Sequence, residues 1–200
     1  EYGVVGGNVY VNIGKAPSAN AAVYLTYGWN SGAVIRDSTA IAPGAAHDGV
    51  GLGCDFGTED CVIERVFGRS APGYVATCGA GSKGCTIRSS ICGGSDGLGC
   101  FRLNAGADAQ NLSAAGNDVG IYVYTLDGET STVTNVAAEA EEVAVDGRGK
   151  GTLTIVTSTT DPQFVGGTSP NTAEGFRLKA TSPGIRAGVY VGRRLDAEGE

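Results

Sequence analysis

The chain has 200 residues, a formal net charge of −7 and 34 glycines. Glycine is far above its average frequency of roughly 7%, which together with valine and threonine predicts many short strands joined by tight turns. The acidic balance argues against nucleic acid as a partner. No apolar run of about 18 residues occurs, so we expect no membrane span.

The first 46 residues are poor in charge. Their charged residues are Glu1, Lys15, Arg36 and Asp37. Because an ordinary solvated surface carries interspersed charges, this segment is expected to be covered either by its own core or by neighbouring subunits.

The segment 1–13 contains an alternating apolar pattern that predicts a strand. Its candidate assembly residues are Val4, Val5, Val9, Tyr10, Val11 and Ile13. A short apolar strand near a terminus offers an open pairing edge unless another strand covers it. It is therefore either the first strand of its own sheet or a strand donated to a neighbouring molecule.

The run Gly6-Gly7-Asn8-Val9-Tyr10-Val11 resembles the Gly-Gly-x-Val start of the extension in bacterial donor-strand pilins. In that family the extension completes the sandwich of the next subunit, so the resemblance implies assembly by strand addition. The chain departs from the family at residues 193–200, which lack its aromatic end. It also lacks the family's single long-range cysteine pair.

Further short strands are predicted along the chain, separated by turn residues. They are residues 22–27, 33–39, 62–67, 74–77, 86–91, 121–126, 142–145, 153–159, 176–180 and 187–191. Residues 105–120 are expected to form a loop or short helix, and residues 146–151 a hairpin turn. The pattern predicts an all-β fold, a β-sandwich (jelly-roll or Ig-like) of roughly 8–10 short strands, as a single domain over 1–200. No repeat of roughly 33 to 45 residues is visible, which disfavours a solenoid.

All six cysteines lie within one Gly-rich stretch, residues 47–102, which we expect to be a disulfide-stapled insertion. Clustered cysteines in even number, without histidine partners, are typical of a disulfide framework. Structural zinc sites use C-x2-C pairs, which this chain lacks, so the spacing argues against zinc. The simplest of several connectivities is local: Cys54–Cys61, Cys78–Cys85 and Cys92–Cys100.

Disulfides predict an oxidising compartment. The chain contains no methionine and begins at Glu1, from which we expect a processed chain that has lost a secretory signal. The predicted location is secreted or extracellular, on a cell-surface appendage.

No catalytic set is found, and the chain is not expected to be an enzyme. The only histidine lies in Ala45-Ala46-His47, which resembles the histidine motif of chymotrypsin-like proteases. The likeness ends at Asp48, where that family has cysteine, and no Gly-Asp-Ser-Gly-Gly follows. A catalytic triad is identified by its complete set of serine, histidine and aspartate, and not by one histidine.

Ligand sites are suggested by two short patterns. Asp55, Glu59 and Asp60 are candidate calcium ligands, because calcium takes carboxylate oxygens in extracellular loops; the alternative is that they are solvated acids. Asn111 begins an Asn-Leu-Ser sequon, a candidate N-glycosylation site. No other cofactor is expected.

These features together predict a structural protein that assembles with copies of itself into a filament, pilus, tube or surface coat. Strand addition would join the subunits and disulfides would harden them. Two alternatives stay open. One is a carbohydrate-binding or adhesin domain using Trp29, Tyr24 and Tyr27; the other is a viral capsid or decoration protein.

Overall fold

The computed structural model describes residues 4–6, 9–11, 24–26, 31–41, 50–55, 57–71, 74–95 and 99–189. These residues form fifteen strands and one 3₁₀ turn, η1 (Glu174–Phe176). No helix within these ranges has the length and hydropathy to cross a membrane. The chain is therefore all-β, and its fold depends on how the strands pair.

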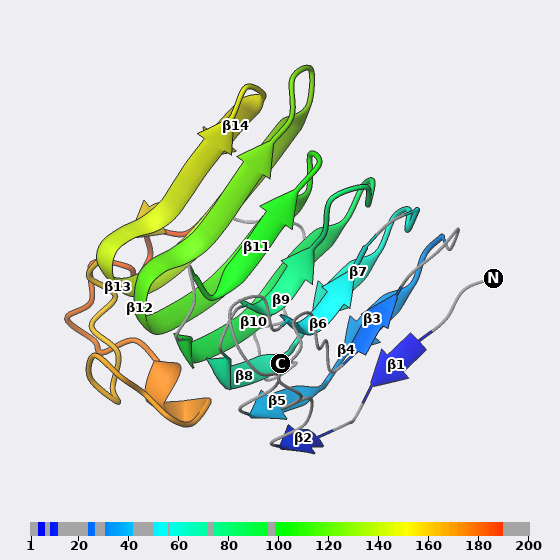
Figure 1. The fold of residues 1–200 in the computed structure, drawn as a ribbon. Coiled ribbons are helices and arrows are strands. Elements are labelled where there is room, and N and C mark those ends of the chain that lie inside the picture. Colours follow the sequence, from blue (N-terminus) through cyan, green and yellow to red (C-terminus); the bar gives the residue numbers. More distant parts are fainter. Residues whose placement is uncertain are drawn as a thin grey trace.

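The strands stack on three faces, which we call the first, second and third face in the order in which the chain visits them (Figure 1). The first face holds β1 (Val4–Gly6), β4 (Val34–Arg36), β7 (Val62–Glu64), β14 (Thr152–Ile155) and the starts of β10 (Thr86–Ser95), β12 (Asp108–Thr125) and β13 (Thr130–Gly149). The second face holds β2 (Val9–Val11), β5 (Thr39–Ile41), β8 (Phe67–Ala71), β15 (Ser158–Thr159) and the continuations of β10, β12 and β13. The third face holds β3 (Tyr24–Thr26), β6 (Val50–Cys54), β9 (Tyr74–Cys78), β11 (Phe101–Asn104) and the ends of β12 and β13.

Every pairing between these strands is parallel, so the chain winds as a parallel β-solenoid. On the first face, Val62 pairs with Thr86 and Thr86 with Asp108; further on, Ala109 pairs with Val133 and Thr130 with Thr152. From β7 onward, successive turns thus take 24, 22, 24 and 22 residues. Figure 1 shows the turns stacked from β1 at one end to β14 at the other.

The predicted β-sandwich is therefore wrong. The Gly-rich run 146–151 does not reverse the chain into a hairpin: β13 and β14 run parallel, because the chain turns a corner and begins the next turn on the first face. Residues 105–120, predicted as a loop or short helix, lie mostly in β12. Nor is the stretch 47–102 an insertion, since its described strands belong to the same three faces.

The core is a set of aligned columns inside the solenoid. Alternate residues of a strand point to opposite sides, so one column per face collects the inward apolar side chains. On the first face it consists of Ile35, Ile63, Ile87, Ala109 and Val133, all fully buried. Stacking of such columns gives a solenoid its stability, because each turn buries its apolar face only against its neighbours.

Five successive turns have left-handed backbone at the same corner. Between the first and second faces lie Asp37, Arg65, Ser89, Asn111 and Asn135, with φ between 47° and 57°. This conformation is uncommon for residues other than glycine, and here it recurs in these five turns where the chain bends. The Nδ2 of Asn135 donates to the Oδ1 of Asn111 at 2.8 Å, so equivalent corner side chains also bond to each other.

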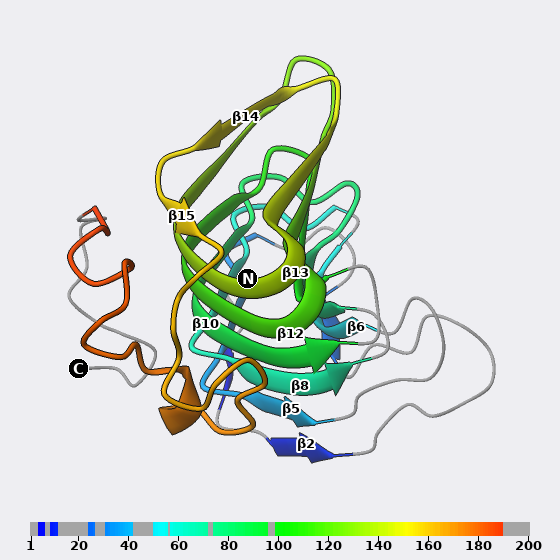
Figure 2. The same ribbon diagram turned by 90° about the vertical axis from the view of Figure 1, so that its left-hand side faces the viewer.

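The residues that follow β15 leave the solenoid and lie against the outside of the second face (Figure 2). Phe164 and Phe176 pack edge-to-face on each other, with ring centres 5.0 Å apart, and bury Ile91 and Ala115 beneath them. The strand predicted at residues 176–180 is absent from this described segment, which contains η1 and irregular turns.

Candidate functional site

Three disulfides lie inside the solenoid, in the local pairing that the cysteine spacing favours. They join Cys54 to Cys61, Cys78 to Cys85, and Cys92 to Cys100, and all six residues are at most 1% exposed. The first two close the corner between the third face and the next first face. The last closes the corner between the second and third faces.

The first two disulfides stack on each other. Cys54 and Cys78 are partners in the strand register, and the amide of Thr86, next to Cys85, donates to the carbonyl of Cys61 at 2.9 Å. As a result the Sγ atoms of Cys54, Cys61 and Cys85 all lie within 4.8 Å of one another. The winding therefore gathers cysteines that are up to 31 residues apart in the sequence.

The loops inside these two disulfides, residues 55–60 and 79–84, are copies of one turn. The Thr58 hydroxyl donates to the carbonyl of Asp55 at 2.5 Å, and the Ser82 hydroxyl to that of Gly79 at 2.8 Å. Both sequences read Cys-x-x-Gly-Thr/Ser-x-x-Cys, 24 residues apart. This short repeat is the signal that could have revealed the solenoid.

The predicted calcium ligands all lie on the first of these loops. Glu59 and Asp60 are exposed, while Asp55 is half-buried against Gly79 of the next loop. Across the described residues, the only group of three metal-ligating atoms that lie together is the cysteine trio. The structure therefore does not bring the three carboxylates together.

An ion-pair ladder runs along the corner between the first and second faces. Arg65 donates to both carboxylate oxygens of Asp37, at 2.7 and 2.9 Å, and to Glu64 at 3.0 Å. Arg88, one turn on, donates to Glu64 at 2.7 Å. The hydrogen bond from Arg65 holds the pKa of Asp37 below its ordinary value. Burial raises the pKa of Glu64, but its hydrogen bonds and charge attraction to Arg88 and Arg65 outweigh burial, so this pKa is lowered too.

This ladder predicts a loss of stability in acid. Both carboxyl pKa values are lower in the folded chain than in the unfolded one, so their stabilisation is present above the unfolded pKa of about 4 and is lost as the pH falls through the folded pKa. We expect Glu64→Gln to lower the free energy of unfolding at pH 7 by about 1–3 kcal/mol, since the side chain is nearly buried. Urea unfolding as a function of pH measures this.

Asp37→Asn is the matched control, because Asp37 belongs to the same ladder but its side chain is 47% exposed. Its expected cost is under about 1 kcal/mol. Equal costs for the two variants, or a Glu64→Gln profile that keeps the full acid dependence, would contradict the prediction.

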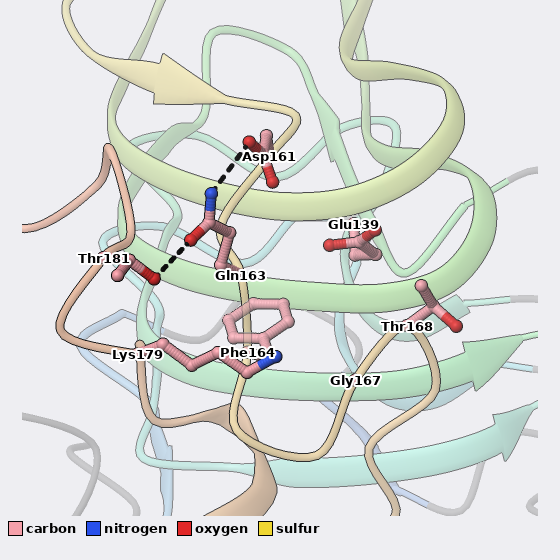
Figure 3. A pocket seen from close by; sticks show the side chains of 8 residues that line it. All are labelled: Glu139, Asp161, Gln163, Phe164, Gly167, Thr168, Lys179 and Thr181. Carbon is pink, nitrogen blue, oxygen red and sulfur yellow. Dashed lines mark hydrogen bonds between the residues drawn. The ribbon is translucent and has the colours of Figure 1, made fainter.

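A shallow pocket lies between β13 and the segment after β15 (Figure 3). Its volume is about 300 Å³, and it is lined by Glu139, Asp161, Gln163, Phe164, Gly167, Thr168, Lys179 and Thr181. Gln163 donates to Asp161 at 3.2 Å and accepts from Thr181 at 2.8 Å. The lining is polar and would suit a small polar molecule, but the geometry assigns it no reaction.

Aromatic and arginine side chains form a row across four turns of the third face, in which Tyr74 is buried and the other three are at least partly exposed. The guanidinium of Arg102 lies 5.6 Å from the ring centre of Tyr74, and that of Arg148 lies 5.1 Å from the ring centre of Tyr122. The two tyrosine rings are 6.3 Å apart. Cation–π contacts of this kind are worth about 0.5–1 kcal/mol at exposed sites, so the row stabilises the stack of turns.

The end of the solenoid at β14 and β15 is open. Within the described residues these two strands pair only with β13, and neither contains a charged residue. Ile155 and Val156 are 45% and 49% exposed there. Leu153 is only partly buried against the core.

The predicted assembly strand lies at the opposite end of the described stack. Val4 and Val5 are in β1, which pairs only with β4 among the described residues; Val9, Tyr10 and Val11 are in β2, which pairs only with β5. Other predicted residues, Ile13, Tyr27, Trp29 and His47, lie outside the described ranges. Asn111, the candidate glycosylation site, is at the left-handed corner with its side chain bonded to Asn135.

Comparison of the chain with protein-family models, curated proteins and solved structures finds no match to any of them.

Proposed function

We propose that this chain is a structural subunit that stacks head to tail with copies of itself, the β14–β15 end of one solenoid on the β1–β2 end of the next. The observation that carries the proposal is the end at β14 and β15: it is uncharged, it exposes Ile155 and Val156, and among the described residues its strands pair only with β13. Natural proteins block such edges with charges, proline or a covering segment, and a solenoid kept as a monomer carries a polar terminal turn.

The two ends are compatible with each other in strand direction and position. β1 and β14 both belong to the first face, and β2 and β15 both belong to the second. Because all strands are parallel, pairing β14 with β1 and β15 with β2 of the next copy repeats the pattern found between neighbouring turns. A head-to-tail contact of this kind does not close on itself unless its rotation closes a ring, so it builds filaments.

This mechanism replaces strand donation into a sandwich. The segment 4–11 keeps the pairing role that its sequence suggests, but as the edge of a stack rather than as a strand completing another subunit's sheet. The three disulfides are compatible with an extracellular location for such a filament, because disulfides persist in oxidising environments.

The test is negative-stain electron microscopy and sedimentation of the purified chain under non-reducing conditions. We expect filaments from the unaltered chain and none from Ile155→Lys, which places a charge at the centre of the pairing edge. Removing residues 1–13 should also abolish filaments. Circular dichroism checks that each variant keeps its β-structure.

Val165→Lys is the matched control, because Val165 is also apolar and 56% exposed but lies in the segment after β15, away from the pairing edge. It should assemble like the unaltered chain. Monomers from the unaltered chain at every concentration, or filaments from Ile155→Lys, would disprove the stacking.

A second candidate function is binding of carbohydrate, favoured by Arg102, Tyr122 and Arg148 along the third face. The Tyr122 ring and the two arginines offer stacking and charged hydrogen bonds to an extended chain of sugars, while the buried Tyr74 only supports Arg102 from beneath. Monodisperse monomers that bind on a glycan array would select this candidate over the first.

A further inference from the structure

We infer that the two stacked cysteine pairs form, when reduced, a four-thiolate site for one soft divalent metal ion such as Zn²⁺. The ligands would be Cys54 and Cys61 from one turn and Cys78 and Cys85 from the next. This inference is independent of the stacking of whole chains, because it concerns the interior of one solenoid.

The geometry of the sulfurs carries the inference. Structural zinc is held by four ligands in a tetrahedron, with Zn–S distances of about 2.3 Å and therefore S···S distances of about 3.8 Å. The Sγ atoms of Cys54, Cys61 and Cys85 are already within 4.8 Å of one another, and the fourth sulfur, that of Cys78, is bonded to Cys85. The Cα atoms of the pairs are 6.4 and 5.9 Å apart. The sulfurs of each pair can therefore separate by side-chain rotation, without moving the strands.

The surroundings also fit a structural metal centre. All four cysteines are at most 1% exposed. The backbone around them is fixed by the pairing of Cys54 with Cys78 and by hydrogen bonds between the two loops, such as those from the amides of Asp60 to Lys83 and of Lys83 to Thr58. A closed site with four protein ligands and no open position is the structural rather than the catalytic type. The absence of a C-x2-C motif does not count against it, since the solenoid register supplies the proximity that a tight turn supplies elsewhere.

A dithiol serves as the reductant of the two disulfides. Each disulfide takes up two electrons and two protons, giving two thiols, while the dithiol becomes its own cyclic disulfide. Binding of Zn²⁺ by the four thiols then releases four protons, because the thiolate is the ligand. The same four residues would thus close the corners as disulfides in an oxidising compartment and as a metal centre in a reducing one.

The experiment refolds the full chain in excess dithiol with Zn²⁺ alone and measures metal content by native mass spectrometry. We expect one ion per chain. Refolding with Co²⁺ should give the absorption bands of tetrahedral thiolate coordination, a signature that purely structural thiols would not produce. Metal should be lost on oxidation, as the disulfides form.

Two double variants separate this site from other cysteines. Cys92→Ser with Cys100→Ser leaves the four ligands intact and should still bind one ion. Cys54→Ser with Cys61→Ser should lose the ion and the cobalt bands. A reduced chain that takes up no metal, one that unfolds and is not refolded by Zn²⁺, or uptake that survives loss of Cys54 and Cys61 would overturn the inference.

Discussion

Replacing Cys78 and Cys85 together by alanine should lower the free energy of unfolding by about 2–5 kcal/mol under oxidising conditions. The disulfide closes a loop with a sequence separation of 7, for which the chain-entropy estimate alone gives about 2.5 kcal/mol. The loop 79–84 contains three glycines and no large apolar side chain, so its unfolded form is unusually free. Urea unfolding without reductant measures the loss.

The pair Cys92 and Cys100 supplies a comparison at a different corner. Its loop has nearly the same separation, 8 residues, so its removal should cost a similar amount. The Sγ of Cys100 also accepts from the amide of Asn117 at 2.9 Å, but that amide keeps a second acceptor, the carbonyl of Ala115. A loss under about 1 kcal/mol for either pair would show that the backbone pairing alone holds these corners.

Strands could be predicted from the sequence, but their partners could not. The alternation at Val9–Val11 and the apolar run at Ile121–Thr125 both lie in strands, β2 and β12. The same alternation suits a sandwich and a solenoid, because in both one side of each strand is buried. The difference is whether the chain reverses or continues around at each turn, and glycine-rich runs such as 146–151 permit either.

The left-handed corners between the first and second faces could not be predicted from the local sequence either. Arg65 and Ser89 adopt left-handed backbone at the same place as Asn111 and Asn135, although arginine and serine, unlike asparagine, do not favour that conformation. Their backbone is set by the turns stacked above and below, as in the bond from Val66 to the Ser90 hydroxyl at 3.3 Å. Tertiary stacking outweighs the local preference of these residues.

Some of the candidate sites could be predicted from spacing along the chain, and others could not. Short spacings predict the local disulfide pairs, since a loop of a few residues brings its own ends together. The gathering of the sulfurs of Cys54, Cys61 and Cys85 depends on the 24-residue register between Cys54 and Cys78, so it follows only from the length of a turn. The acids Asp55, Glu59 and Asp60 lie within six residues of sequence but are not gathered in space, which shows how weakly closeness along the chain predicts a ligand site.

The inward column of the first face makes a sharp prediction about stability. Ile87 and Ile155 occupy the same column, joined through Ala109 and Val133, yet Ile87 is fully buried and Ile155 is 45% exposed at the open end. Ile87→Ala should therefore cost about 2–5 kcal/mol of unfolding free energy, from lost burial and the cavity left inside the stack.

Ile155→Ala should cost under about 1.5 kcal/mol in the monomer, because only part of that side chain leaves water on folding. Thermal and urea unfolding at low protein concentration compare the two variants. Equal losses would mean that the end at β14 is covered in solution even in the monomer, which would also remove the exposed edge on which the stacking of copies depends. A large loss for Ile155→Ala only at concentrations where filaments form would instead show that a second copy buries this side chain.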